Sequence, residues 1–309
     1  MQALVKLGSW LRDSGYRFVT PTPLTHSRVN ARDALEAHNL RDVFGWSRPF
    51  RENLLPASAL TWLQQAALLD NAGGLLCSKV RFSSLGDQLY AHSAYPTTDA
   101  DSVFFGPDTY RFASLIENEL AVQPLTSGAR ILDIGCGAGP GGISAALASI
   151  GSPRLVLADI NPKALRFAGA NAALAGMESI ELLESNLFES VAGDFDLIVS
   201  NPPYLVDAAA RTYRHGGGAL GSGLSERILQ QGMLQLAPGG RLVLYTGAAI
   251  VEGEDPFFQR VQTLLSGNAW PFRYRELDPD VFGEELDTKA YAHVERIASV
   301  ALVVQRPGA

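Results

Sequence analysis

Residues 131–142 read ILDIGCGAGPGG, a short, mainly apolar run followed by glycines at 135, 137, 139, 141 and 142. A mainly apolar run of this length is typical of a strand that is buried on both faces of a parallel sheet. The glycines at 135, 137 and 139 allow a tight turn and let the backbone approach a ligand closely. The stretch therefore predicts a strand, a ligand-binding turn and a helix in succession.

The same alternation continues along the second half of the chain. Repeated strand–helix–strand units imply right-handed crossovers and a doubly wound, mostly parallel sheet in an α/β fold. Residues 272–277 and 297–305 are expected to close that sheet as an antiparallel pair. The expected strands are 130–134, 154–159, 180–184, 195–200 and 241–247, and the expected helices are 140–150, 162–175, 224–236 and 256–267.

The first hundred residues show a different pattern, with expected helices at 2–14, 29–40 and 57–69. Two short alternating runs, 77–82 and 87–92, follow and predict a hairpin joined by 83–86. Helices followed by a hairpin indicate a small α+β, winged-helix-like accessory domain. The predicted division is thus 1–100 for this domain, 101–128 for a connecting segment with a helix, and 129–309 for the α/β domain. A lid and a nucleic-acid-binding module both remain open as its role.

Composition restricts the class of protein. Hydrophobic residues make up 47% of the 309 residues and charged residues 18%, as in ordinary globular proteins. No apolar run approaches the roughly 20 residues that cross a bilayer, and the first residues lack the features of a signal peptide. We therefore expect a cytoplasmic protein without membrane contact. Cys77 and Cys136 are too few for a disulfide framework or a zinc site, so no metal is expected.

Charge bears on the partner. The formal net charge is −7, and neither half of the chain has the broad basic excess of proteins that bind nucleic acid through its phosphates. This mildly favours a protein or small-molecule substrate and leaves room for a local basic stripe.

The glycine-rich turn could accept two kinds of cofactor. Residues 137–142 formally match the dinucleotide pattern G-x-G-x-x-G, which by itself is a weak signal. Asp133, however, precedes the turn at the end of its strand, and a carboxylate there favours a cationic sulfonium over a pyrophosphate. Asp159 ends the next strand and can accept both hydroxyls of a ribose. A nicotinamide dehydrogenase is therefore the least favoured interpretation.

Two later strand ends complete the candidate site. Asn186 and Leu187 follow the third strand, where a side chain and an amide can recognise an adenine edge. The fourth strand ends in Asn201-Pro202-Pro203-Tyr204. Proline cannot continue a strand, and it holds the residue before it extended, so this segment predicts a stiff loop. The carboxyl edge of a parallel sheet is where open α/β proteins bind their ligands.

Together these segments resemble a known family. D-I-G-C-G-A-G at 133–139, A-D-I-N-P at 158–162, S-N-L-F at 185–188 and F-D-L-I-V-S-N-P-P-Y at 195–204 resemble class I S-adenosylmethionine-dependent methyltransferases of the N-P-P-Y branch. The chain is similar to the HemK-type protein-glutamine N5-methyltransferases that act on release factors. The branch also contains enzymes that methylate exocyclic amines of adenine or guanine in RNA or DNA. The resemblance covers about residues 100–250 and implies a seven-stranded Rossmann-like methyltransferase sheet.

The resemblance also implies site residues, with S-adenosylmethionine as cofactor and S-adenosylhomocysteine as product. Asn186 stands where the family usually has aspartate, and its carbonyl oxygen can still accept from the adenine amino group. The implied catalytic residues are Asn201, Pro202 and Tyr204. The expected cofactor-binding residues are Asp133, Gly135, Cys136, Gly137, Gly139, Asp159, Ile160, Asn186, Leu187 and Asn201. The expected substrate-binding residues are Asn201, Pro202, Pro203, Tyr204, Arg214 and His215.

The Asn201–Tyr204 segment suits a planar nitrogen, whose lone pair is delocalised. The Asn201 side-chain oxygen and the Pro202 carbonyl can each accept one N–H of an NH2 group, and these bonds strengthen as the nitrogen becomes positive. Tyr204 would offer a face on which a planar amide or base stacks. We expect transfer of methyl to a planar NH2 nitrogen.

Two macromolecular substrates remain possible. A protein glutamine is favoured by the acidic charge and by Gly106–Thr109, which is similar to the proline-acid-threonine loop of the glutamine enzymes. A nucleobase is favoured by the winged-helix-like first hundred residues, which do not resemble the helical substrate domain of those enzymes. A catalytically silent cofactor-sensing protein is the alternative from another class. The sequence decides neither the methyl acceptor nor the oligomeric state.

Overall fold

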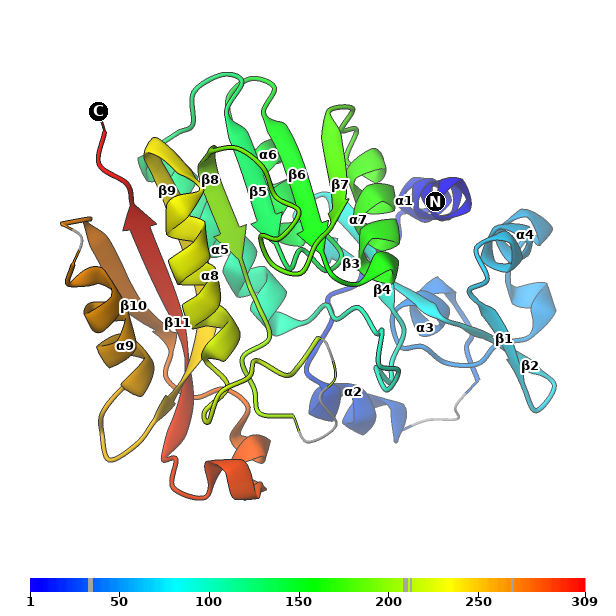
Figure 1. Cartoon of the computed structure of the whole chain (residues 1–309). Coiled ribbons are helices and arrows are strands. Elements are labelled where there is room, and N and C mark those ends of the chain that lie inside the picture. Colours follow the sequence, from blue (N-terminus) through cyan, green and yellow to red (C-terminus); the bar gives the residue numbers. More distant parts are fainter. Residues whose placement is uncertain (33–35, 208–210, 212, 268, 309) are drawn as a thin grey trace.

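The computed structural model describes residues 1–309 apart from 33–35, 208–210, 212, 268 and 309. Its centre is a seven-stranded sheet in the order β10-β11-β9-β8-β5-β6-β7 (Figure 1). Strands β9, β8, β5, β6 and β7 are parallel to one another, and β11 runs antiparallel to both β9 and β10. The predicted seven-stranded, mostly parallel α/β sheet with its closing antiparallel pair is confirmed. The strands are β5 (Arg130–Ile134), β6 (Arg154–Asp159), β7 (Ile180–Glu184), β8 (Phe195–Ser200), β9 (Leu236–Ile250), β10 (Phe272–Asp278) and β11 (Arg296–Gln305).

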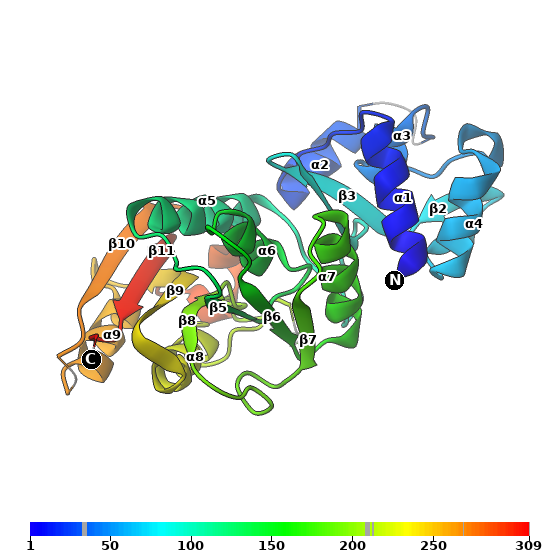
Figure 2. The ribbon, with the colours of Figure 1, turned by 90° about the horizontal axis from the view of Figure 1, so that it is seen from above.

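Helices cover both faces of this sheet, as Figure 2 shows from above. One apolar core lies between the sheet and α5 (Pro107–Val122), α6 (Pro140–Leu147) and α7 (Pro162–Leu174). A second lies between the opposite face and α8 (Gly223–Leu234) and α9 (Pro256–Leu265). Neighbouring residues of the inner strands, such as Ile131 and Leu132, point into different cores and are both fully buried. This explains why these strands are continuously apolar rather than alternating.

Residues before the sheet form a group of helices and two small hairpins beside α7, at the β7 end of the molecule (Figure 1). Its own core, which includes Leu7, Phe44 and Phe82, continues into Phe167 and Leu174 of α7. The elements are α1 (Gln2–Asp13), α2 (Pro23–Asn30), α3 (Leu40–Phe44), α4 (Ala57–Gln65), β1 (Leu69–Ala72), β2 (Leu75–Ser78), β3 (Val80–Leu85) and β4 (Gln88–Ser93). Helices and small sheets are thus present as predicted, and the division at residues 100 and 128 stays a prediction.

Several predicted boundaries in this region are wrong. The expected helix 29–40 is wrong for its described residues, and residues 33–35 lie outside the described part of the chain. Helix α2 begins earlier and ends at Asn30, because Thr22 caps it and Pro23 occupies its first turn, and Asn39 caps α3. The expected helix 57–69 ends at Gln65, and an unpredicted hairpin, β1–β2, follows. The expected strand 77–82 is split between two hairpins, since Ser78 ends β2 and Val80 begins β3.

Two further boundaries differ. Residues 83–85 belong to β3, and the β3–β4 turn is made by Gly86 and Asp87 between the paired Leu85 and Gln88. Strand β9 begins at Leu236 and extends to Ile250, so it is longer than the expected 241–247. Pro238–Gly240 therefore lie inside a strand, where the pairing with β8 shifts register.

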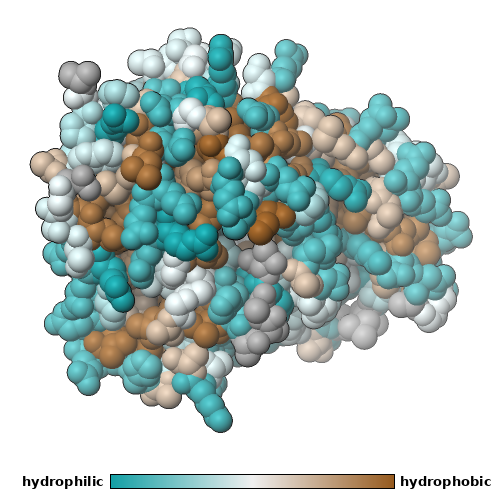
Figure 3. Space-filling model, in the orientation of Figure 1, coloured by the Kyte–Doolittle hydropathy of each residue, from teal (hydrophilic) through white to brown (hydrophobic). Residues whose placement is uncertain are grey.

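Hydrophilic side chains lie over much of the face shown in Figure 3. Among the described residues, no helix is both long enough and apolar enough to cross a membrane.

Asn171 joins the first hundred residues to the sheet domain. Its side chain is 1% exposed. Oδ1 accepts from Ala91 N–H at 2.7 Å, and Nδ2 donates to Ala91 O at 3.0 Å and to Ala138 O at 2.8 Å. One amide in α7 thus pairs with β4 on one side and with the glycine-rich turn on the other.

Replacing Asn171 tests this joint. In Asn171→Leu the backbone groups of Ala91 and Ala138 lose their partners in a buried setting, so we expect the free energy of unfolding to fall by about 3 kcal/mol. Chemical denaturation measures the change. Asn118→Ala, on the exposed side of α5, is the control and should change stability by less than about 0.5 kcal/mol. Equal small losses in both variants would show that the joint contributes little.

Candidate active site

A cavity of about 310 Å³ lies where β5, β6, β7 and β8 end. Because these strands are parallel, their carboxyl ends share one edge of the sheet, and the residues that follow them converge there. The volume is within the range of small-molecule sites. Its wall contains Asp133, Gly135, Cys136, Gly137, Asp159, Ile160, Asn186, Leu187, Asn201, Pro202, Pro203 and His215, all of which the sequence singled out.

The turn after β5 is held by the carboxylate at the end of β6. Gly135 and Gly137 have φ values of +67° and +54°, which residues with a Cβ rarely adopt. Asp159 accepts from Gly137 N–H and from Asn161 N–H, both at 2.8 Å. The two backbone donors fix the carboxylate at the cavity wall, and each oxygen keeps a lone pair for a further donor.

Asp133 is the second carboxylate in the wall, and it is 1% exposed. It accepts from Gly142 N–H, at the start of α6, at 2.7 Å. Burial, with a smaller contribution from the nearby Asp159 charge, raises the pKa of Asp133 to about 7. Burial also raises the pKa of Asp159. Two carboxylates kept from water would both be stabilised by a positively charged ligand.

Asn186 is oriented by a neighbour. Its Nδ2 donates to Glu189 Oε1 at 2.8 Å, which leaves its Oδ1 able to accept from a ligand. Leu187 lies beside it in the cavity wall with a φ of +52°. Asn186 can therefore still accept a hydrogen bond from an amino group of a ligand.

Gly139 is the first of three expected site residues that are not in the cavity wall. It caps α6 with a φ of +82°, and a Cβ there would lie 3.3 Å from Ala168 Cβ in α7. Its neighbours Ala138 and Pro140 line the cavity instead. Gly139 therefore allows α6 to pack closely on α7 rather than touching a ligand.

Tyr204 is the second, and the expectation that it offers a stacking face is wrong. The residue is 7% exposed, and its hydroxyl donates to Asp108 Oδ2 at 2.6 Å. Tyr245 in β9 donates to the other oxygen of Asp108 at 2.8 Å. The ring packs edge-on against Phe282 at 5.8 Å. Tyr204 thus anchors the loop that carries Asn201 and Pro202 from behind.

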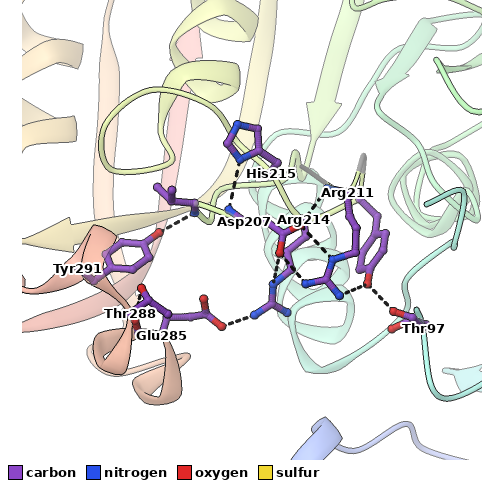
Figure 4. Close-up of polar contacts among 10 residues, drawn as sticks. Thr97, Asp207, Arg211, Arg214, His215, Glu285, Thr288 and Tyr291 are labelled. Carbon is purple, nitrogen blue, oxygen red and sulfur yellow. Dashed lines mark hydrogen bonds and ion pairs between the residues drawn. The ribbon is translucent and has the colours of Figure 1, made fainter. Parts of the chain in front are cut away.

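Arg214 is the third. As Figure 4 shows, its guanidinium reaches Glu285 and Asp207. Asp207 also accepts from Arg211, with contacts at 2.5 and 3.0 Å. Arg214 therefore ties the loop after β8 to the segment between β10 and β11, and it does not line the cavity. The expected substrate contact from Arg214 stays a prediction.

His215 does line the cavity. Its Nδ1 accepts from Asp207 N–H at 3.2 Å, as seen in Figure 4. A neutral imidazole that accepts at Nδ1 carries its proton on Nε2, so the second ring nitrogen is a donor. His215 can offer this donor to a carbonyl oxygen or ring nitrogen next to an NH2 group.

Sequence reasoning missed several lining residues. The most informative are Phe104, before α5, and Tyr213, in the loop after β8, whose rings are nearly parallel with centroids 6.5 Å apart. The paired aromatics at 104 and 105 and the neighbours of His215 were the available signals. The remaining missed residues are Ser102, Val103, Thr109, Phe112, Ala138, Pro140, Asn161, Ala164, Ser185, Leu224 and Ile228.

Gly106–Thr109, expected as a loop, instead begins α5. Gly106 caps the helix, and Pro107 occupies its first turn. Asp108 is 6% exposed and receives both tyrosine hydroxyls, while Thr109 lines the cavity. The motif therefore supports the loop after β8.

Comparisons with known proteins agree with this geometry. Residues 113–252 match the sequence model of the family described as Methyltransferase small domain. The resemblance that the motifs carry is thereby confirmed for this part of the chain, which contains every strand end that forms the cavity.

Two curated relatives carry different names. The chain is 32% identical over 160 residues to "Release factor glutamine methyltransferase" of Deinococcus radiodurans, covering 48% of this chain and 55% of that one. It is 42% identical over 121 residues to "Ribosomal RNA small subunit methyltransferase C" of Salmonella newport, covering 37% of this chain and 34% of that one. The chain thus spans about half and about a third of the length of these relatives.

Among solved structures, Trm5b from Pyrococcus abyssi is similar, with a TM-score of 0.50 and 14% identity. The similarity covers 77% of this chain and 62% of that one. At this identity the likeness shows the fold alone.

The raised pKa of Asp133 predicts a pH effect on stability. The folded protein keeps a proton on Asp133 between pH 4 and 7 that the unfolded chain has lost, so this group lowers stability as the pH rises through that interval. Asp133→Asn removes the titration. We expect ligand-free Asp133→Asn to gain up to about 4 kcal/mol relative to the wild type between pH 4 and 8.

Denaturation of both proteins across this pH range measures the gain. Asp194→Asn, at an exposed position before β8, is the control and should run parallel to the wild type. Parallel curves for Asp133→Asn as well would show that Asp133 titrates near its ordinary pKa.

The anchoring role of Tyr204 is tested by Tyr204→Phe. The change removes a donor from the buried Asp108, so we expect a loss of about 1–3 kcal/mol in stability and, for the methyl transfer proposed below, a slower rate at unchanged cofactor affinity. Tyr274→Phe is the matched control, because Tyr274 donates to Asp255 at 2.6 Å far from the cavity. It should cost stability without slowing transfer. Equal transfer rates in the two variants would contradict the anchoring role.

Proposed function

We propose that this chain transfers a methyl group from S-adenosylmethionine to a planar NH2 nitrogen of a macromolecule. One observation carries the proposal. Asn201 and Pro202, which are expected to accept hydrogen bonds from the substrate, line the same cavity as the buried carboxylates Asp133 and Asp159. One part of the wall thus suits a cationic ligand with a ribose, and the adjoining part suits an NH2 group.

The residues present fit the cofactor. Asp133 and the turn at 135–137 would hold its methionine part, Asp159 its ribose, and Asn186 its adenine amino group. The free lone pairs of Asp159 and the available Oδ1 of Asn186 support these assignments. When bound, S-adenosylmethionine supplies a methyl group made electrophilic by the sulfonium.

The chain's own residues would orient the nucleophile. Asn201 Oδ1 and Pro202 O each accept one N–H of the substrate, so the nitrogen lone pair faces the methyl group. As the nitrogen–carbon bond forms and the sulfur–carbon bond breaks, the nitrogen becomes positive and both hydrogen bonds strengthen. The extra proton then leaves to water. The prolines at 202 and 203 and the buried Tyr204 keep these acceptors in place, so little reorganisation is needed.

The group that receives the methyl is a glutamine amide or a nucleobase amine. The case for glutamine is the sequence evidence given above. One part of that evidence, Gly106–Thr109, also has a structural explanation as the anchor of the loop after β8. The nearly parallel rings of Phe104 and Tyr213 favour the nucleobase, because aromatic faces stack on bases. The names of the two curated relatives divide in the same way.

The role of Asn201 is tested by Asn201→Ala. The variant loses an acceptor that acts mainly in the transition state, so turnover should fall by about 10²–10³ with cofactor affinity nearly unchanged. Steady-state kinetics and cofactor titration separate the two effects, and Asn118→Ala serves as the surface control. Lost cofactor binding with normal turnover per bound cofactor would show that Asn201 is a cofactor ligand instead.

The class of substrate is tested by tritium transfer. Purified protein and methyl-labelled S-adenosylmethionine are added to cell extract treated with nucleases or with protease. Label that survives nuclease but not protease identifies a protein substrate, and the reverse identifies nucleic acid. Tight cofactor binding with no label in either extract would overturn the proposed transfer and favour the cofactor-sensing alternative.

A further inference from the structure

Arg81, in β3, is a buried cation without a carboxylate partner among the described residues. It is 4% exposed, and its Nε and Nη2 have no hydrogen-bond partner within the described part of the chain. Its guanidinium lies over the Phe18 ring, 5.4 Å from the centroid. Burial lowers the pKa of Arg81 to about 10, so it is charged at neutral pH. An unpaired buried charge is costly, and an anion would relieve that cost.

His26, in α2, adds a third donor to the same small pocket. Asn30 Oδ1 accepts from Arg48 Nε at 3.0 Å, which directs Asn30 Nδ2 toward His26 Nε2, also at 3.0 Å. Burial, helped by the Arg81 charge, lowers the pKa of His26 to about 4, so the ring is neutral. A neutral ring that accepts at Nε2 carries its proton on Nδ1. His26 Nδ1 is buried without a partner among the described residues.

The pocket holding these donors has a volume of about 20 Å³, and both Arg81 and His26 line it. This is room for about one oxygen atom. Nε and Nη2 of Arg81 with Nδ1 of His26 make a set of donors without an acceptor, which is the pattern of an anion site. His92, also in the pocket wall, contrasts with them because both its nitrogens are bonded, to Ser83 and Ser93.

The pocket adjoins the proposed catalytic cavity. Phe104 lines both. Thr97, which lines the small pocket, accepts from the hydroxyl of Tyr213 in the cavity wall at 2.5 Å. Phe104 therefore separates an anionic group bound to Arg81 from the space beside the Phe104 and Tyr213 rings.

We propose that Arg81 and His26 bind one unesterified oxygen of a backbone phosphate of a nucleic-acid substrate, next to the nucleotide whose base enters the cavity. The inference rests on the proposed function and selects its nucleobase alternative. A nucleotide has a planar base, which can stack on the Phe104 and Tyr213 rings, and next to it a phosphate, which can bind the Arg81 guanidinium. A carboxylate from an acidic peptide would satisfy Arg81, but it brings no ring for Phe104 and Tyr213.

Binding without the cofactor tests the proposal independently of methyl transfer. The probes are adenosine and guanosine, each with and without a 5′-phosphate, inorganic phosphate, and a glutamate-containing pentapeptide, all at constant ionic strength. Isothermal titration gives each affinity. We expect the 5′-phosphate to tighten nucleoside binding at least about tenfold, as charge-assisted hydrogen bonds do. Inorganic phosphate should bind more weakly than either nucleotide, because it lacks the base.

Arg81→Met should abolish the advantage of the phosphate and raise the melting temperature, because it removes an unpaired buried charge. Arg260→Met, on the exposed side of α9, is the control for net charge and should bind as the wild type does. Asn201→Ala should also keep the phosphate advantage while losing turnover, which separates this inference from the proposed function.

Three results would overturn the proposal. The first is equal binding of nucleosides and nucleotides by the wild type, a measurement that needs no variant. The second is an undiminished phosphate advantage in folded Arg81→Met. The third is a preference for the acidic peptide that depends on Arg81, which would make the pocket a peptide site. If Arg81→Met does not fold, Arg81→Lys, which keeps the charge but loses the planar fork, should retain only part of the advantage.

Discussion

The parallel alignment of β5, β6, β7 and β8 is the constraint on which the candidate site depends. In this register Ile134 pairs with Ser200 and with Ala158, and Asp159 pairs with Glu184, so the four strands end at one level. The side chains that follow them must then converge on a common space. The hydrogen bonds from Gly137 and Asn161 to Asp159 join the first two of these ends. A change in the register would separate groups that are tens of residues apart in the chain.

The loop after β8 is held by residues from three other parts of the chain. Behind the cavity, Asp108 at the start of α5 accepts from the Tyr204 hydroxyl at one carboxylate oxygen and from Tyr245 of β9 at the other. Tyr291, between β10 and β11, accepts from Val206 N–H at 2.9 Å. Glu285, in the same connection, meets Arg214. The connection between β10 and β11 thus helps to position the loop that carries Asn201 and Pro202, and the buried Asp108 joins Tyr204 of that loop to Tyr245 of β9.

The first hundred residues contribute to the same edge of the molecule. Their core continues into α7, and Asn171 pairs with both β4 and the glycine-rich turn. Through Thr97 and Tyr213 they also reach the loop after β8. The first hundred residues, which do not resemble the helical substrate domain of the glutamine enzymes, therefore adjoin the cavity. They contain the buried Arg81, which has no carboxylate partner among the described residues.

The sequence by itself determined the sheet and most of the cavity wall. Apolar runs, glycines and prolines act locally, and a parallel sheet brings its strand ends together without further information. Only the tertiary structure decided where Tyr204 and Arg214 point, because their partners Asp108 and Glu285 are distant in the chain and pair through burial. The helix limits before residue 70 are different, because the caps Thr22 and Asn39 are local signals in the sequence that outweigh a weak apolar pattern. The burial of Arg81 was decided by the tertiary structure, since a charged residue in a strand pattern is expected at the surface, whereas its guanidinium packs over Phe18, distant in the chain.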